Sequence, residues 1–176
     1  MKIFNEGENI VIGDFDEIEA LRVAVKLEND GMKFYLKSSE LAPDEETKQM
    51  FKNLVKEEAK HIQRFEKRAE EIGKAKNIEV DLSRGGEEEF FDFIDPGVFG
   101  DTLNIEKVIA GVNNCLDALT IGEQSEVNAI NFYKAILKHN DSEAGKAVIK
   151  DIIKEEQKHL KTLIKYKELL EKKGGK

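Results

Sequence analysis

The chain repeats itself, and this repeat constrains the fold more than any other feature of the sequence. A shift of 98 residues aligns the second half with the first half without a gap. The matched pairs are Ala20-Leu21 with Ala118-Leu119, Glu28 with Glu126, Phe34-Tyr35 with Phe132-Tyr133, Glu57-Glu58 with Glu155-Glu156, Lys60 with Lys158, and His61 with His159. The sequence therefore predicts two similar units that pack against each other.

Each repeat unit has the pattern of two helices joined by a short link. Stretches rich in Glu, Lys, Leu, Ile and Ala place apolar residues at steps of three and four, which is the spacing of one helix face. The predicted helices cover about residues 15–40, 44–72, 104–139 and 143–172. The links around Pro43 and Asp141 are short, so the two helices of each pair are expected to run antiparallel.

The connection between the two pairs, residues 73–103, is long and differs in composition. It contains five glycines, Pro96, the acidic run from Glu87 to Glu89 and four phenylalanines. This length suffices to return along the whole bundle. The sequence therefore predicts an all-α fold, an antiparallel four-helix bundle made of two repeated helical hairpins joined by a long crossover. Residues 1–13 are predicted to form an N-terminal arm and residues 14–173 the bundle.

Composition argues against several classes of function. The chain has 28 Lys and Arg against 36 Asp and Glu, and the resulting net charge of −8 disfavours nucleic acid as a partner. No run of 18 apolar residues occurs, so no membrane partner is expected. The single cysteine, Cys115, cannot form an internal disulfide or a four-thiolate metal site, and a cytoplasmic location is expected.

Four glutamates lie on the helix faces that should be apolar: Glu28, Glu58, Glu126 and Glu156. Burying ionised carboxylates is costly unless positive charge compensates them. No Lys or Arg shares these faces, but His61 and His159 each follow a glutamate by three residues, which is one helical turn. Carboxylate oxygens with one imidazole per metal suit iron or manganese, so the pattern predicts a two-metal site in the bundle core.

With these residues identified, the chain resembles the di-iron domain of rubrerythrin, in the ferritin-like superfamily, over about residues 15–172. The resemblance implies a ferritin-like bundle that holds two iron ions, with manganese or a mixed pair as the alternative. The implied metal ligands are Glu28, Glu58, His61, Glu123, Glu126, Glu156 and His159. Glu123 precedes Glu126 by three residues, and it resembles the additional carboxylate that the third helix of rubrerythrins supplies. This resemblance implies a catalytic role for Glu123 and makes His61 the ligand that moves with the redox state.

Two tyrosines occupy matched positions two turns after a ligand glutamate, on the same helix face. We expect Tyr35 and Tyr133 to be catalytic residues whose hydroxyl groups hydrogen-bond the ligand carboxylates. The alternative is that they are core aromatics with satisfied hydroxyls. Gly31 and Ala129 are small and lie one turn past a ligand glutamate, so they either leave room for a small oxidant or permit close helix packing.

Other side chains that could bind a metal ion are not expected to belong to the site. Glu57 and Glu155 point about 100° away from the ligand face, so we expect them to be solvated. Cys115 lies among apolar residues and is expected to be an inert core thiol. His139 has no glutamate three residues before it and is expected on the surface near a helix end.

The resemblance implies a non-haem di-iron peroxidase of rubrerythrin type, which reduces hydrogen peroxide to water and acts in oxidative-stress defence. The two Cys-x-x-Cys motifs of a rubredoxin domain are missing, so an external electron donor such as rubredoxin is implied. The alternatives are a ferroxidase or iron-handling protein that uses dioxygen or peroxide, and a non-catalytic metal-binding bundle. A homodimer is expected, and exchange of hairpins through the long crossover is one way to form it.

Overall fold

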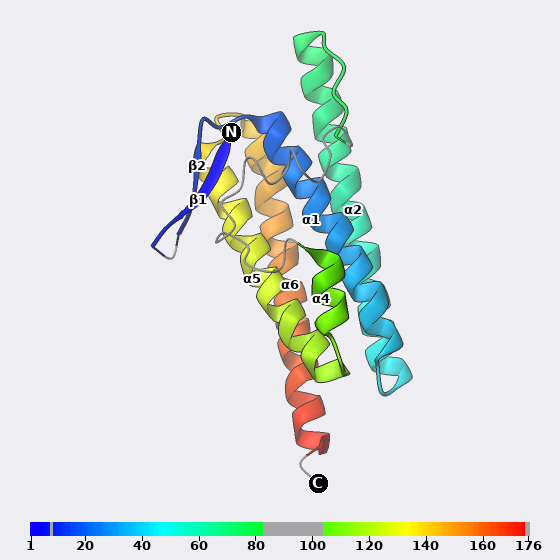
Figure 1. Cartoon of the computed structure of the whole chain (residues 1–176). Coiled ribbons are helices and arrows are strands. Elements are labelled where there is room, and N and C mark those ends of the chain that lie inside the picture. The colour runs from blue at the N-terminus through cyan, green and yellow to red at the C-terminus, as the bar shows by residue number, and fades with distance from the viewer. Residues whose placement is uncertain (8, 83–103, 175–176) are drawn as a thin grey trace.

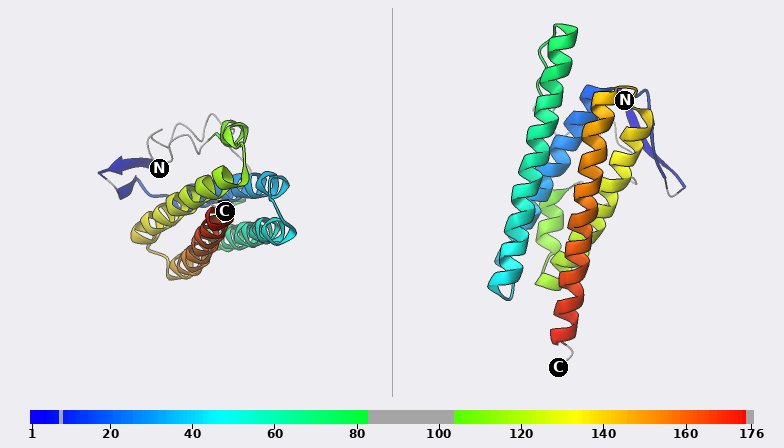
Figure 2. Two further views of the ribbon diagram at one scale, coloured as in Figure 1. Left: turned by 90° about the horizontal axis from the view of Figure 1, so that it is seen from below. Right: turned by 180° about the vertical axis from the view of Figure 1, so that it is seen from behind.

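Four long helices form an antiparallel bundle in the computed structural model, which describes residues 1–7, 9–82 and 104–174. The helices are α1 (Glu17–Glu40), α2 (Glu45–Lys76), α5 (Cys115–His139) and α6 (Glu143–Gly174). Short links join α1 to α2 and α5 to α6, so each pair is a hairpin, and the two hairpins lie side by side (Figures 1 and 2). The predicted bundle of two helical hairpins is confirmed. The part of the chain predicted to form most of the crossover, residues 83–103, lies outside the described residues.

The repeat seen in the sequence sets the helix boundaries. α2 and α6 each contain 32 residues and begin 98 positions apart. The helix starts are capped alike: Asp16 and Asn114 accept a hydrogen bond from the backbone three residues on, and so do Asp44 and Ser142. Side-chain caps of this kind satisfy backbone N–H groups that a helix start leaves unpaired. The two hairpins therefore begin and end at equivalent residues.

The apolar core is divided into two clusters along the bundle. One cluster contains Phe65, Phe132 and Ile152 and lies at the end of the bundle that contacts the N-terminal arm. The other contains Phe51, Leu119 and Leu163. Tyr133 belongs to the first cluster and Tyr35 to the second, and both hydroxyls face the polar residues between the clusters. The bundle thus has a polar layer with apolar packing on both sides of it.

The helix predicted over residues 104–139 is wrong in one respect, because it is interrupted. A short helix, α4 (Ile105–Gly111), precedes α5, and the chain between them is extended at Val112. The side chain of Asn114 starts a new helix by accepting a hydrogen bond from the backbone N–H of Asp117 at 2.9 Å. As a result α4 does not continue α5 but packs beside α1, as Figure 1 shows.

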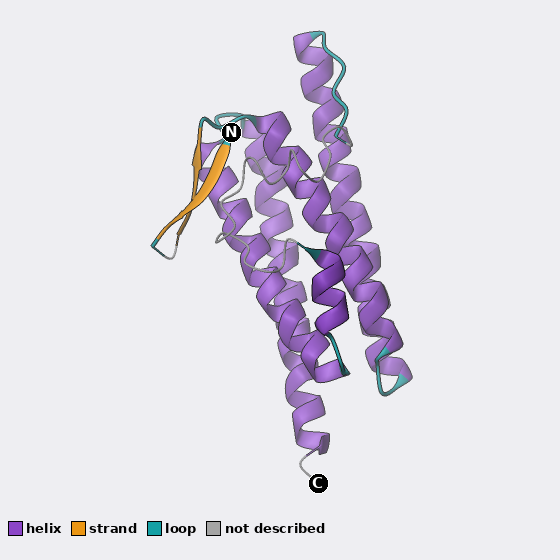
Figure 3. Ribbon diagram, in the orientation of Figure 1, coloured by secondary structure: helices purple, strands orange, loops and turns teal. Residues whose placement is uncertain are grey.

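The N-terminal arm is a β-hairpin of β1 (Lys2–Glu6) and β2 (Asn9–Gly13), which are the strands in Figure 3. The strands pair antiparallel with Ile3 opposite Ile12. Gly7 has a φ of +65° between the strands, a conformation that glycine adopts without strain. The side chains of Ile3 and Ile12 are buried and join the apolar cluster at this end of the bundle.

No helix within the described residues is both long and apolar enough to cross a membrane.

Replacing Asn114 by Ala is expected to destabilise the protein by about 1 kcal/mol, because the N-cap of α5 is lost. Asn114 is exposed, so the change removes little packing. Urea unfolding followed by circular dichroism measures the difference, and Asn114→Asp, which keeps a capping oxygen, is the control. Equal loss of stability in both variants would show that the cap does not contribute.

Candidate metal centre

Six of the seven predicted metal ligands converge in the polar layer of the bundle. Glu28 comes from α1, Glu58 and His61 from α2, Glu126 from α5, and Glu156 and His159 from α6. All six are buried, with between 0% and 6% of their surface exposed. The helices place them there because each glutamate lies on the inward face and each histidine follows one turn later.

The six side chains form two overlapping sets of donor atoms. One set is Glu28, Glu58, His61 and Glu156, and the other is Glu58, Glu126, Glu156 and His159. Within each set the donor atoms all lie within 4.8 Å of one another. Each set thus has three carboxylates and one imidazole, and Glu58 and Glu156 belong to both. This is the arrangement that two neighbouring metal ions with shared carboxylates require.

Three buried polar atoms in these sets make no well-aligned hydrogen bond among the described residues, although each lies within 3.1 Å of an imidazole or carboxylate atom. They are one carboxylate oxygen of Glu58, one of Glu156 and the Nδ1 atom of His159. Buried polar atoms are almost always hydrogen-bonded, because leaving one unpaired is costly. Three such atoms within two donor sets fit side chains that bind metal ions. The hard oxygen donors favour iron or manganese over a softer metal.

The electrostatics of the cluster explain why it needs cations. Burial raises the pKa of Glu28 and Glu126 well above the ordinary value, and the neighbouring charges of Glu156 and Glu58 raise these pKa values further. For Glu58, burial also acts to raise the pKa, but the nearby imidazoles of His159 and His61 outweigh it and lower the pKa. The pKa values of Glu28 and Glu126 therefore differ in direction from that of Glu58, which lies close to both imidazoles.

The two histidines supply that positive charge when no metal is bound. Burial alone would lower the pKa of His159, but the close carboxylates of Glu156 and Glu58 outweigh it and raise the pKa to about 10. The pKa of His61 is raised in the same way by Glu156, Glu28 and Glu58, also against the effect of burial. Without metal, the imidazoles are protonated and partly offset the carboxylate charge.

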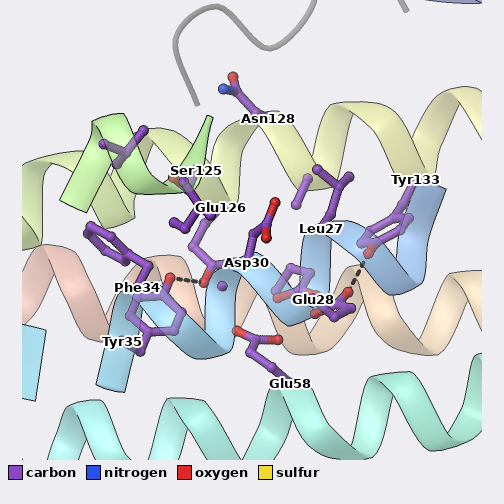
Figure 4. Close-up of a pocket in the computed structure, with 15 residues that line it drawn as sticks. Leu27, Glu28, Asp30, Phe34, Tyr35, Glu58, Ser125, Glu126, Asn128 and Tyr133 are labelled. Carbon is purple, nitrogen blue, oxygen red and sulfur yellow. Dashed lines mark hydrogen bonds between the residues drawn. The ribbon is translucent and has the colours of Figure 1, made fainter. Parts of the chain in front are cut away.

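The two tyrosines hydrogen-bond to one carboxylate of each donor set. The hydroxyl of Tyr35 donates to Glu126 and the hydroxyl of Tyr133 donates to Glu28, as Figure 4 shows. Both rings are buried, and burial followed by the nearby carboxylates raises the pKa of each hydroxyl. The hydroxyls therefore stay protonated and orient the carboxylates. The hydrogen bonds expected from the sequence are present, and each one crosses from one repeat unit to the other.

Glu123 does not join the cluster. Its carboxylate lies 2.9 Å from Nζ of Lys167, and a third of its side chain is exposed. Glu123 lies one turn before Glu126 on α5, beyond the end of the donor sets, whereas Ala129, one turn after Glu126, lines the cavity beside them. The structure thus differs from the expectation that Glu123 supplies an additional ligand, because a shift of one turn carries its carboxylate past the cluster.

Glu155 is the site residue that sequence analysis missed. We expected it to be solvated, but its carboxylate lies 2.9 Å from Nε2 of His61 and accepts hydrogen bonds from Arg64. Its repeat mate Glu57 is more exposed and pairs with Lys60 at 2.6 Å. A difference between the repeats was the available signal, since Arg64 corresponds to Thr162 in the second half.

A cavity of about 70 Å³ reaches the carboxylates from the side of α1 and α5. Its walls include Leu27, Gly31 and Ala129, together with Ile105 and Val108 of α4. Figure 4 shows Glu58, Glu28 and Glu126 beside this space, with Asn128 farther out. About two water molecules fit in a cavity of this size. Small residues at the matched positions 31 and 129 therefore border an open space beside the cluster.

The family model described as rubrerythrin matches residues 19–167, which include all six converging residues. No curated protein and no solved structure matches the chain.

Metal binding is expected to release protons and to become stronger as the pH rises. The raised pKa values of His159, to about 10, and of His61 mean that both imidazoles hold a proton at neutral pH. A metal ion needs the neutral imidazole, so binding displaces these protons, and a lower pH opposes it. Calorimetric titration with Co²⁺ in buffers of different ionisation enthalpy counts the protons released. An affinity that stays constant across the neutral pH range would contradict this expectation.

Proposed function

The chain belongs to the rubrerythrin family, and on that basis we propose that it is a non-haem di-iron peroxidase that reduces hydrogen peroxide to water. The observation that carries the proposal is the pair of buried donor sets that share Glu58 and Glu156. Two adjacent ferrous ions held there would supply the two electrons that reduction of one peroxide molecule requires. The two donor sets lie inside the ferritin-like bundle, and each of its four long helices contributes to them.

Iron is the metal that the donor chemistry supports best. Each set combines three carboxylates with one imidazole, which suits iron and, as the alternative, manganese. Four carboxylates balance the charge of two divalent ions when both histidines are neutral. Charge balance makes the pair of ions tolerable in a buried layer where isolated carboxylates are not.

The residues around the donor sets have separate tasks in this proposal. Glu58 and Glu156 bind both metal positions. Glu28 and Glu126 each belong to one position, and Tyr133 and Tyr35 fix their orientation by hydrogen bonds. Because burial raises the pKa of both tyrosines, their hydroxyls keep the protons that these hydrogen bonds require. The site is thereby held in place by contacts between the two repeat units.

The size of the cavity supports a small oxidant as the substrate. A space of about 70 Å³ beside the carboxylates is large enough for hydrogen peroxide or dioxygen. Electrons would come from an external donor such as rubredoxin, because the one cysteine of this chain, Cys115, cannot form a cysteine-ligated iron site.

Anaerobic titration of the reduced, iron-loaded protein with hydrogen peroxide tests the proposal. We expect one peroxide to oxidise both iron ions of one chain, since each iron gives one electron. Absorption spectroscopy follows the oxidation, and the iron retained after gel filtration distinguishes a peroxidase from an iron-handling protein. Slow oxidation by peroxide, or release of the oxidised iron as a mineral, would contradict the peroxidase proposal.

The double variant Glu58→Ala with Glu156→Ala is expected to lose the metal pair, because both donor sets lose both shared carboxylates. After iron loading, the unchanged protein should hold about two ions per chain by elemental analysis. Glu57→Ala is the matched control, because it removes an exposed carboxylate next to Glu58. A double variant that retains its full iron content would refute the ligand assignment.

Replacing Ala129 by Leu is expected to slow oxidation by peroxide at least tenfold while leaving the iron content unchanged. The larger side chain fills part of the cavity beside the carboxylates, but it replaces none of the donors. Stopped-flow absorption of the reduced protein measures the rate, and Ala129→Ser, which adds one oxygen atom only, is the control. If the Leu and Ser variants react at the same rate, the cavity is not the route of the oxidant.

A further inference from the structure

The outer nitrogen of His61 is held by a pair of charged residues outside the donor sets. Nε2 of His61 lies 2.9 Å from a carboxylate oxygen of Glu155. Arg64 donates to both oxygens of the same carboxylate, at 2.8 Å and 3.1 Å. A two-point contact of this kind fixes the plane of the carboxylate as well as its position. The chain of contacts therefore runs from Arg64 through Glu155 to the imidazole.

The inner nitrogen of His61 faces the donor set. Its Nδ1 lies 3.0 Å from Glu156, 3.1 Å from Glu58 and 3.4 Å from Glu28. With Nε2 held at the other end of the ring, the imidazole cannot turn without breaking its contact to Glu155. The imidazole ring itself has no exposed surface.

The second half of the repeat lacks this device. The residue that corresponds to Glu155 is Glu57, which pairs with Lys60. Among the described residues, the carboxylates near His159 approach its Nδ1 and none approaches its Nε2. The residue that corresponds to Arg64 is Thr162, whose hydroxyl donates to the backbone of Lys158. The two histidines are equivalent in the sequence repeat but not in their surroundings.

We infer that Arg64 and Glu155 are positioning residues that hold His61, and not His159, as a fixed ligand with Nδ1 toward the metal. The inference rests on the metal binding in the proposed function, but not on peroxide as the oxidant. It departs from the expectation, drawn from resemblance, that His61 moves with the redox state. It also makes the two metal positions unequal, with the stronger histidine ligand in the set that contains Glu28.

The physical reason is the usual effect of a carboxylate behind a metal-bound histidine. A hydrogen bond from the outer N–H to a carboxylate fixes the tautomer and the orientation of the ring, and it makes the inner nitrogen a better donor. Removing such a partner weakens metal binding by about tenfold to a hundredfold. Arg64 holds the carboxylate aimed at the ring, since it donates a hydrogen bond to each of its two oxygens.

Titration of the full chain with Co²⁺, followed by visible absorption, tests the inference on the metal alone. Glu155→Ala is expected to weaken one of two binding steps by tenfold or more and to leave the other step unchanged. Glu57→Ala, the same change at the repeat mate, is expected to change neither step. Glu155→Gln should restore part of the lost affinity because its amide oxygen still accepts the N–H, and Arg64→Thr should weaken the same step as Glu155→Ala.

A second measurement reports on the ring itself. In Zn²⁺-loaded protein labelled with ¹⁵N-histidine, the Nε2–H proton of His61 should exchange with solvent more slowly than that of His159, and Glu155→Ala should remove the difference. Equal exchange in the unchanged protein, or equal effects of Glu155→Ala and Glu57→Ala on Co²⁺ binding, would overturn the inference while the proposed function stands. A chain that binds no pair of ions would overturn both.

Discussion

The structure depends on one electrostatic constraint: four carboxylates share a buried layer with only two imidazoles. Burial and mutual repulsion raise the pKa of Glu28 and Glu126, and contacts with the carboxylates raise the pKa of both histidines. Protons on the carboxylates and imidazoles reduce part of this repulsion. Divalent metal ions reduce it further, because each ion carries two positive charges and binds several carboxylates at once. Such a layer destabilises a protein core that binds no metal, but it suits a metal site. The tyrosines, the cavity and the Arg64–Glu155 pair all lie beside this layer and act on its side chains.

The sequence predicted the parts of this protein that repeat. Helix spacing and the shift of 98 residues led to the four long helices, their pairing and the six converging side chains, because the repeat tests each assignment twice. The break before α5 was missed although Gly111 and Asn114 are residue types that commonly end and begin helices, because the apolar spacing continues through this region. For residues 1–13 the sequence predicted an arm and not a β-hairpin, because a pair of short strands is stable only when it packs on the bundle.

Side chains that differ between the repeats were the hardest to assign. Glu123 lies three residues before Glu126, and Glu155 lies directly before Glu156. The resemblance to rubrerythrins implied a ligand role for Glu123, whereas helix geometry placed Glu155 away from the ligand face. The outcome was decided by partners on other helices, since Lys167 of α6 draws Glu123 outward and Arg64 of α2 holds Glu155 against His61. Such partners are distant in sequence, so a pattern along one helix does not contain them. The contrast between Arg64 and Thr162 is a trace of such a partner in the sequence.

The division of the apolar core into two clusters has a consequence for how the protein handles the loss of its ions. The clusters around Phe65 and around Phe51 are separate, and the polar layer between them contributes little hydrophobic packing of its own. Without bound metal, the polar layer is therefore the least stable part of the bundle, while the apolar clusters on both sides of it stay packed. Local opening of the polar layer would expose the carboxylates while both apolar clusters keep their packing. Metal ions could then be exchanged without unfolding of the whole chain.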